Sequence, residues 1–291
     1  GSESLIGWGA LSGLAADPAE AGKLYAVSDS AYAAAPTIYT IDATQTPARI
    51  TAGLPVTRGG APAQKLDLEG IASDGEGGFW LASEGRSDRL IPHALYHVDA
   101  EGKILAEVAF PEALLPSEIR FGAEGVAKVG STLWVAIQRE WKDDPKGFTK
   151  ILRYTPATKT WGVLHYPLEA TKAEGGWVGL SEITAVGPDT FVVIERDNQF
   201  GDSALKTLHS FSVAGLTAAA PGDAKVPVVT KRLLRNLVPD LQKPHGYVLD
   251  KVESFAVDSA GQAFAITDND GVDGSNGETQ FLRLGVLPGL R

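Results

Sequence analysis

Acidic side chains recur at equivalent places in a repeated sequence pattern, and this grouping is the first indication of chemistry. Each repeat contains a strand-like segment, a turn, a second apolar strand and a hydrophilic run. One position of the first strand reads, in successive repeats, Ser12, Glu69, Glu124, Ser181 and Glu253, and Glu182 follows in the fourth repeat. Carboxylates that are brought together repel one another unless a cation or arginines compensate them. The pattern therefore predicts either a cation site or ion pairs that tie the repeats together.

A second set of polar residues follows directly on the apolar strand of each repeat. These runs are residues 28–30, 83–85, 138–140, 195–198 and 267–270. Because equivalent strand ends should meet at one face, we expect their oxygen atoms to lie together, and such hard ligands suit calcium or magnesium. The expected metal ligands are Glu69, Glu124, Glu182, Glu253, Asp29, Asp197, Asp268 and Asp270. Calcium is the expected ion, and another divalent cation is the alternative.

Two arginines lie in the same hydrophilic runs and add positive charge beside the acids. Arginine next to metal-held carboxylates forms a suitable pocket for a phosphate or carboxylate group. We therefore expect a catalytic set in which the arginines bind substrate oxygens and two glutamates stand at the cation. The residues of this set are Arg139, Arg196, Glu195 and Glu84.

The loop from Asp268 to Glu278 is the stretch richest in potential cation ligands. It is not an EF-hand loop, because Val272 stands where a third side-chain ligand would fall. Clusters of Asn, Asp and Gly are also common in solvated turns. We favour calcium because the predicted acidic ring lies next to this loop. The sequence contains no Gly-x-Ser-x-Gly elbow that would indicate a serine nucleophile.

The elements that must position these residues follow from the repeat itself. The first-strand positions lie 57, 55, 57 and 72 residues apart in successive repeats. A recurring period of this kind predicts an all-β propeller with five four-stranded blades, with six blades or a sandwich as alternatives. The last repeat has three strands, so we expect the segment around Leu5–Gly9 to supply the fourth and close the ring. In the fourth repeat, we expect an outer strand at 226–231 and a short helix at 232–238.

Composition narrows the classes of partner. The chain has 291 residues, of which 44% are hydrophobic and 21% charged, as expected for a folded globular protein. Its net charge of −10 argues against nucleic acid or an anionic membrane as a main partner. We expect one domain over residues 3–291 and no transmembrane segment, because no apolar run reaches the length of a membrane span.

The sulfur content and the N-terminus bear on the expected compartment. The sequence contains no cysteine and no methionine, which excludes a disulfide framework and a thiolate metal site. Gly1-Ser2 looks like a remnant of an expression tag, so a native leader would have been removed. We therefore expect a periplasmic or secreted protein.

Several phrases of the chain resemble a known family. They are residues 68–72 (LEGIA), 82–85 (ASEG), 123–127 (AEGVA), 194–198 (IERDN) and 266–270 (ITDND). These resemble the phytase-like domain family, described as having esterase-like activity of phytase, whose members are largely bacterial and exported. The resemblance implies a propeller, an acidic channel mouth, a divalent cation and hydrolysis of phosphoesters or esters. The more distantly similar calcium-dependent propeller phytases have six blades, so their site residues are not transferred to this chain.

Three functional hypotheses remain open from the sequence. The first is a calcium-dependent phosphoester or ester hydrolase that acts on a small, possibly phosphorylated molecule. The second is a non-catalytic propeller module that binds calcium or a ligand, because fold alone does not decide function. The third is a lactonase-like esterase, in which one channel calcium polarises a lactone carbonyl. The sequence leaves the substrate and the oligomeric state open.

Overall fold

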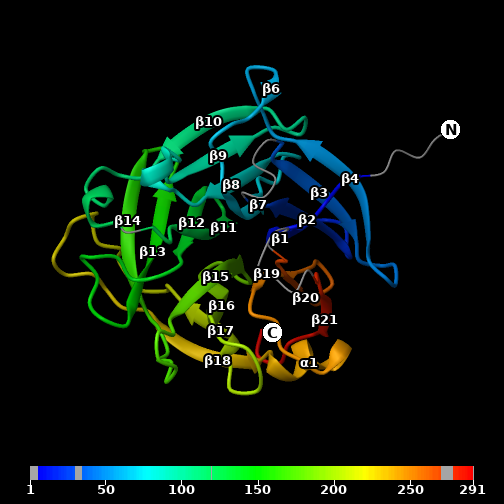
Figure 1. The fold of residues 1–291 in the computed structure, drawn as a ribbon. Helices are drawn as coiled ribbons and strands as arrows, with labels where there is room; N and C mark the ends of the chain where they lie inside the picture. The colour runs from blue at the N-terminus through cyan, green and yellow to red at the C-terminus, as the bar shows by residue number, and fades with distance from the viewer. Residues whose placement is uncertain (1–5, 30–34, 119, 270–277, 291) are drawn as a thin grey trace.

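Five β-sheets surround a central axis as the blades of a propeller (Figure 1). The computed structural model describes residues 6–29, 35–118, 120–269 and 278–290. Within these residues, four sheets have four strands and the fifth has three. The five-bladed propeller predicted from the repeats is confirmed.

The first two blades run outward from the channel in chain order. Blade 1 contains β1 (Leu11–Ala16), β2 (Lys23–Ser28), β3 (Thr37–Asp42) and β4 (Arg49–Pro55). Blade 2 contains β7 (Leu68–Ser73), β8 (Phe79–Ser83), β9 (Ala94–Val98) and β10 (Ile104–Ala109). A small hairpin of β5 (Thr57–Arg58) and β6 (Ala61–Pro62) joins them.

The remaining blades repeat this order, and all neighbouring strands within a blade are antiparallel. Blade 3 contains β11 (Ala123–Val129), β12 (Thr132–Ile137), β13 (Phe148–Thr155) and β14 (Thr160–Pro167). Blade 4 contains β15 (Val178–Ala185), β16 (Thr190–Asp197), β17 (Lys206–Ser212) and β18 (Thr230–Asn236). Blade 5 contains β19 (Val252–Val257), β20 (Ala263–Thr267) and β21 (Phe281–Gly285).

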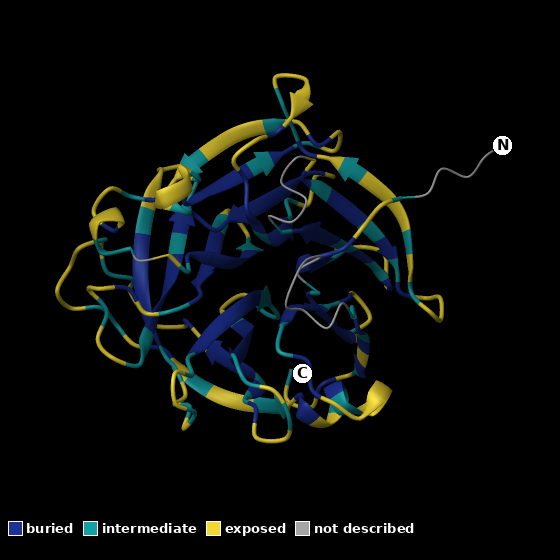
Figure 2. Cartoon of the chain, in the orientation of Figure 1, coloured by how far each residue is buried: buried dark blue, intermediate teal, exposed yellow. Residues whose placement is uncertain are grey.

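The burial of each strand follows its distance from the axis. The second strands are packed on both faces by neighbouring blades, so β8 and β20 are buried along their whole length and are almost entirely apolar. The outer strands β4 and β10 face solvent along much of their length (Figure 2). The hydrophobic core is therefore a series of layers between adjacent blades, and it holds the inner ends of the strands rigidly.

The ring closes between blade 1 and blade 5 through side-chain hydrogen bonds. The amide of Ala10 donates to Oδ1 of Asn269 at 2.8 Å, and the amide of Gly22 donates to Oδ2 of Asp258 at 2.9 Å. The structure differs from the expected closing strand at Leu5–Gly9. Leu5 lies outside the described residues, and residues 6–9 form no strand, since Gly7 instead accepts a hydrogen bond from the Tyr39 hydroxyl.

The connection between blades 4 and 5 also differs from expectation. The outer strand expected at 226–231 is β18 at Thr230–Asn236, which pairs with β17. Residues 232–236 therefore belong to a strand, and the short helix expected at 232–238 is wrong. The helix of the connection is α1 (Val238–His245), which ends at Gly246 in the left-handed region at φ 82°. Among the described residues, no helix is both long enough and apolar enough to cross a membrane.

Candidate functional site

A β-bulge interrupts the register at the same point of each inner strand. The shifts lie between residues 11 and 13, 68 and 70, 123 and 125, 180 and 182, and 252 and 254. The extra residues are Ser12, Glu69, Glu124, Ser181 and Glu253. Bulges redirect side chains and are frequent beside functional sites. The residues that the repeat aligned in sequence are therefore also equivalent in local backbone geometry, at one end of the channel.

Glycines next to these bulges bring the inner strands close together. A Cβ atom added to Gly70 would lie 2.6 Å from the Cα of Gly125, and one added to Gly13 would lie 2.8 Å from the carbonyl oxygen of Glu69. A side chain at either position would force neighbouring blades apart. The close approach narrows the channel and concentrates the carboxylates at its mouth.

Three carboxylates at this mouth form a cluster with the dimensions of a metal site. One oxygen from each of Asp67, Glu69 and Glu84 lies within 4.8 Å of the others, and the three groups are buried. Asp67 directly precedes β7, and Glu84 follows β8. The amide of Glu84 donates to the Asp67 carbonyl at 2.8 Å, which fixes the two residues side by side. The structure thus brings together two expected residues, Glu69 and Glu84, and adds Asp67.

Several carboxyl groups at the channel mouth have pKa values well above the ordinary range. Burial raises the pKa of Glu84 to about 7, and the nearby Asp67 carboxylate adds to the rise. Burial and the Glu124 carboxylate raise the pKa of Glu69 well above its usual range. Burial and the Glu84 carboxylate do the same for Glu124. Like charges in a desolvated site resist ionisation, so this site would gain stability from a bound cation.

Asp268 and Asp29 extend the acidic mouth from blades 5 and 1. Burial raises the pKa of Asp268 to about 9, with further contributions from Glu253 and Asp29. Lys251 lies 3.8 Å from Asp268 and partly offsets its charge. The hydroxyl of Ser12 donates to Oδ2 of Asp268 at 3.4 Å. The expected ligand Asp270 lies outside the described residues.

Glu253 differs from the other glutamates of the ring because an arginine neutralises it. Although burial acts to raise its pKa, Arg196 and Lys251 hold it below its usual value. Nη2 of Arg196 donates to Oε1 of Glu253, and its Nη1 lies 3.5 Å from Oδ1 of Asp250. Arg196 is buried, and its Nε donates to the hydroxyl of Ser181. All three of its guanidinium nitrogens therefore contact protein oxygens. Its expected role of binding substrate oxygens therefore competes with an existing structural role.

Arg139 offers a more accessible guanidinium at the same end of the propeller. Its Cζ lies 4.3 Å from the ring centroid of Phe121 and 4.8 Å from that of Trp177. Arg196 stacks on the same Trp177 at 5.1 Å. Stacking on aromatic faces orients an arginine while leaving its N–H edge available for an anion. Trp177, half-buried before β15, was missed by sequence reasoning because no charge or spacing marks it.

Glu182 lies deeper in the channel, away from the cluster. Its Oε2 accepts a hydrogen bond from the amide of Leu14 at 3.1 Å, and Oε1 accepts one from Ile183 at 3.0 Å. Burial raises its pKa well above the usual range, while these amides and that of Phe255 act in the opposite direction. Glu182 thus braces blade 4 against blades 1 and 5, and its oxygens are engaged by backbone.

Glu195 lies on the opposite face of β16 from Arg196, because successive strand residues point to opposite sides. Its carboxylate faces blade 3, where the hydroxyl of Tyr166 donates to it at 2.8 Å. The Nζ of Lys231, from β18 of its own blade, lies 2.8 Å from the same carboxylate. Nδ1 of His209 lies 3.3 Å from the same carboxylate. The structure therefore separates Glu195 from the acidic mouth that it was expected to join.

Asp197 is also engaged elsewhere. Its Oδ1 lies 3.2 Å from the Nζ of Lys206, a fully buried lysine that bridges to Asp250 at the same distance. The expected acidic site residues that the structure describes, metal ligands and catalytic glutamates together, consequently fall into two groups. Those at the mouth are Glu69, Glu84, Glu124, Glu253, Asp29 and Asp268, and those held by other partners are Glu182, Glu195 and Asp197.

His93 contacts the backbone beside Glu84 and was not expected as a site residue from the sequence. Its Nδ1 accepts a hydrogen bond from the amide of Gly85 at 3.1 Å, and its Nε2 faces a carboxylate oxygen of Glu118. Gly122 packs against the same ring and donates its amide to Oε1 of Glu84 at 3.1 Å. His93 therefore contacts both the residue that follows Glu84 and the glycine whose amide binds the Glu84 side chain. No spacing in the sequence indicates this contact, whereas the Asp-x-Glu spacing of Asp67 and Glu69 is a usable signal.

Comparison with known proteins places the chain in a family. The Phytase-like family, described as "Esterase-like activity of phytase", matches residues 6–271. The chain belongs to the phytase-like family. The matched region includes all five inner strands and every described carboxylate of the acidic mouth. None of the curated proteins compared with the chain matches it.

Similarity to a solved structure with a TM-score above 0.5 supports the fold of this phytase-like protein and nothing further. Glutaminyl cyclase of Myxococcus xanthus is similar with a TM-score of 0.52 and 11% identity, covering 96% of this chain and 91% of the cyclase. The allergen Mala s 1 of Malassezia sympodialis is similar with a TM-score of 0.48 and 12% identity, covering 94% of this chain and 77% of the allergen. At such low identity, no activity is transferred from either protein.

Proposed function

We propose that this phytase-like propeller is a divalent-cation-dependent hydrolase of small phosphoesters, with calcium as the preferred ion. The observation that carries the proposal is the buried cluster of Asp67, Glu69 and Glu84 at the channel mouth. Burial and nearby like charges raise the pKa values of Glu69 and Glu84. A bound cation would offset both the desolvation of these carboxylates and the repulsion between them.

The dimensions and chemistry of the cluster fit such an ion. Calcium binds oxygen ligands at about 2.3–2.6 Å, so ligands on opposite sides of one ion lie roughly 5 Å apart. The ligand oxygens of the cluster lie within 4.8 Å of one another. All are hard carboxylate oxygens, which favour calcium or magnesium over softer metals. When bound, the ion would supply charge neutralisation, orientation of the phosphate and activation of a water.

The protein groups around the cluster suit the remaining tasks of phosphoester hydrolysis. Arg139, oriented by Phe121 and Trp177, would bind phosphate oxygens at the mouth. Glu124 has a raised pKa and is held by Gln138, whose Nε2 donates to Oε1 at 2.7 Å. A carboxyl group that stays protonated near neutral pH can donate its proton to a leaving oxygen. We therefore assign substrate binding to Arg139 and proton donation to Glu124.

The test begins with protein stripped of metal by a chelator and titrated with CaCl₂ or MgCl₂ by calorimetry. We expect one tight calcium site in the wild type and at least about tenfold weaker binding in Asp67→Asn and Glu84→Gln, because each variant loses an ionised ligand. Glu174→Gln removes an exposed acid that does not belong to the cluster and serves as the matched control. Equal binding by all four proteins would contradict the cation site.

Turnover is then measured with p-nitrophenyl phosphate, p-nitrophenyl acetate and a γ-lactone, each with and without calcium. We expect calcium-dependent release from the phosphoester and a higher KM in Arg139→Gln. Turnover of the lactone alone would support a lactonase-like enzyme instead. Calcium binding without turnover of any of the three would support a non-catalytic binding module. Turnover that is unchanged by chelation would contradict a metal-dependent mechanism.

We further propose that the protein functions in the periplasm or outside the cell. The proposal rests on the absence of both oxidisable sulfur residues from the sequence and on a cation site that suits a calcium-rich compartment. Fractionation of the native host cells with an antibody to the protein tests it. Recovery with cytosolic markers would contradict the proposal.

A further inference from the structure

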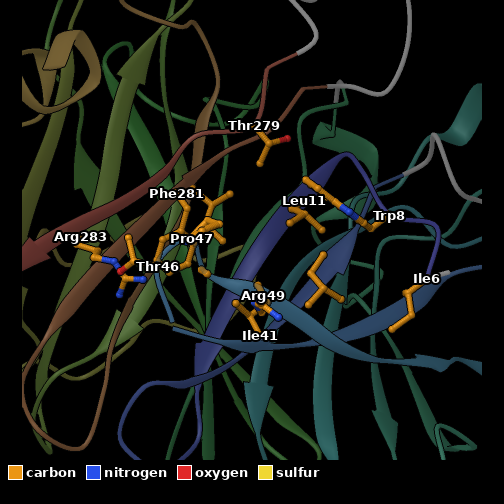
Figure 3. Close-up of a pocket in the computed structure, with 13 residues that line it drawn as sticks. Ile6, Trp8, Leu11, Ile41, Thr46, Pro47, Arg49, Thr279, Phe281 and Arg283 are labelled. Carbon is orange, nitrogen blue, oxygen red and sulfur yellow. The ribbon is translucent and has the colours of Figure 1, made fainter. Parts of the chain in front are cut away.

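An apolar cavity lies between the facing sides of blade 1 and blade 5, apart from the acidic mouth. Its volume is about 720 Å³, within the range of roughly 300–1,000 Å³ that holds small-molecule ligands. Leu11 of β1 and Ile41 of β3 form one wall, and Ile266 of β20 and Phe281 of β21 form the other (Figure 3). The turn between β3 and β4, with Thr46 and Pro47, closes one end.

The cavity follows from the composition of blade 5. The other four blades have an outer fourth strand, whereas the described part of blade 5 ends at β21. The outer part of the blade 1 face, including Ile50 of β4, therefore has no strand opposite it among the described residues. Apolar surface is left accessible where the other interfaces between blades are covered.

Two arginines give this apolar cavity positive charge. Arg283 lines it beside the turn of Thr46 and Pro47, and Arg49 of β4 lines it between Arg283 and Ile6 (Figure 3). Arg283 donates to the carbonyl oxygens of Ala43 and Gln45, which fix its guanidinium in place. Neither arginine forms an ion pair with a carboxylate in the part of the chain that the structure describes.

Asp42 stands opposite Arg49 in the β3–β4 ladder, but it is only weakly coupled to the arginines. The Thr44 hydroxyl and amide are the main groups that lower the pKa of Asp42, and Arg283 contributes least. In a chain whose net charge is −10, two arginines without a paired carboxylate beside an apolar cavity are a local reversal of charge. Such a wall is complementary to an anionic group.

An aromatic side chain lines the cavity away from Arg283. Trp8 is 46% exposed although it is large and apolar, and Figure 3 places it beside Leu11, on the far side from Arg283. Exposed aromatic residues beside apolar pockets commonly contact ligands. The cavity thus has apolar walls, an exposed tryptophan on one side, Arg283 on the far side from it, and Arg49 between the two.

We propose that this cavity binds an amphiphilic anion, a molecule with an aliphatic body and a carboxylate or phosphate head. The body lies between the walls of blades 1 and 5 and extends toward Trp8, and the head group contacts Arg49 and Arg283. The site is separate from the acidic mouth, whose negative charge would repel such a head group.

The test is calorimetric titration of the whole protein with dodecanoate and with dodecyl phosphate, below the concentrations at which either forms micelles. Dodecyltrimethylammonium, with the same chain and the opposite charge, is the comparison ligand. Arg49→Gln removes an exposed arginine that makes no described bond, so its fold should persist. Ala48→Phe places bulk at the cavity wall. Arg89→Gln, an exposed arginine of blade 2, is the matched control, and melting curves check the fold of each variant.

We expect saturable binding of at least one of the two anions and no binding of the cation. The affinity should fall at least about tenfold in Arg49→Gln and should be lost in Ala48→Phe, because a charge-assisted contact and the space for the chain are removed. The control should bind like the wild type. Binding of the cation as tightly as the anions, or unchanged binding in both folded variants, would overturn the proposal. So would the failure of both anions to bind.

Discussion

Ser181 accepts a hydrogen bond of 2.7 Å from the Nε of Arg196. Ser181 stands at the bulge position that carries a glutamate in blades 2, 3 and 5. The same arginine donates to Glu253, the equivalent residue of the next blade. The small serine therefore leaves space in which a buried arginine can reach the ring of acids. Arg196 of blade 4 thus supplies positive charge that partly neutralises the carboxylates of the other blades.

The Arg196–Glu253 pair should contribute strongly to stability. In Arg196→Gln, we expect the free energy of unfolding to fall by about 3–5 kcal/mol, because Glu253 would remain buried without its partner. Urea denaturation at pH 7 measures this change. Arg139→Gln removes an arginine that stacks on two aromatic rings and has no salt bridge among the described residues, so a loss below about 1 kcal/mol is expected. Similar losses in the two variants would contradict this assignment.

The metal-free protein should lose stability as the pH rises. The folded-state pKa of Glu84 is about 7 and that of Asp268 about 9, compared with ordinary values of 4.5 and 3.8. Between these limits the folded protein binds more protons than the unfolded chain, so the free energy of unfolding falls with increasing pH. Urea denaturation in the presence of a chelator from pH 5 to 8 tests the sign.

Glu84→Gln should make this decline shallower between pH 5 and 7, because the variant lacks one of the titrating groups. Glu174→Gln, which changes an exposed acid, should follow the wild-type curve. A stability that rises over the same range would show that the carboxylates are stabilised as anions in the folded state, and it would contradict the predicted pKa shifts.

Glu182 should act on stability and not on cation binding. Glu182→Ala would leave the buried amides of Leu14, Ile183 and Phe255 without their acceptor, and each unsatisfied amide costs about 1–3 kcal/mol. We expect a loss of about 3 kcal/mol or more in urea denaturation, with calcium affinity within about twofold of the wild type. A folded variant that has lost calcium binding would place Glu182 in the cation site.

Gly122 should be required for the position of Glu84. A Cβ added to Gly122 would lie 2.2 Å from Nδ1 of His93, so Gly122→Ala would displace the imidazole and the amide that binds Glu84. We expect a loss of about 1–3 kcal/mol and weaker calcium binding by calorimetry.

Gly53→Ala is the matched control for that change, because the nearest atoms to its new Cβ lie 3.4 Å away, at an ordinary contact distance. It should leave calcium binding unchanged. Wild-type calcium affinity in folded Gly122→Ala would mean that His93 and Gly122 do not position the cluster.

Local pattern was sufficient to predict the propeller because its blades repeat in phase. The alternation of Glu253, Phe255 and Val257 and the apolar run of β20 recur in each repeat, so strand type, blade number and the ring of acids were all predictable. The outer elements were less predictable. Residues 232–236 form part of β18 through pairing with β17, which a short apolar sequence does not reveal.

The sequence by itself determined that carboxylates from several blades would gather at one end of the channel, because equivalent residues of a closed repeat form a ring. Only the tertiary structure decided which of them meet. The bulges and the glycine contacts bring Glu69 and Glu84 to Asp67, whereas strand alternation turns Glu195 toward Tyr166 and Lys231. Backbone amides from two other blades occupy Glu182. These outcomes depend on contacts between residues far apart in the chain, and local sequence patterns do not predict such contacts.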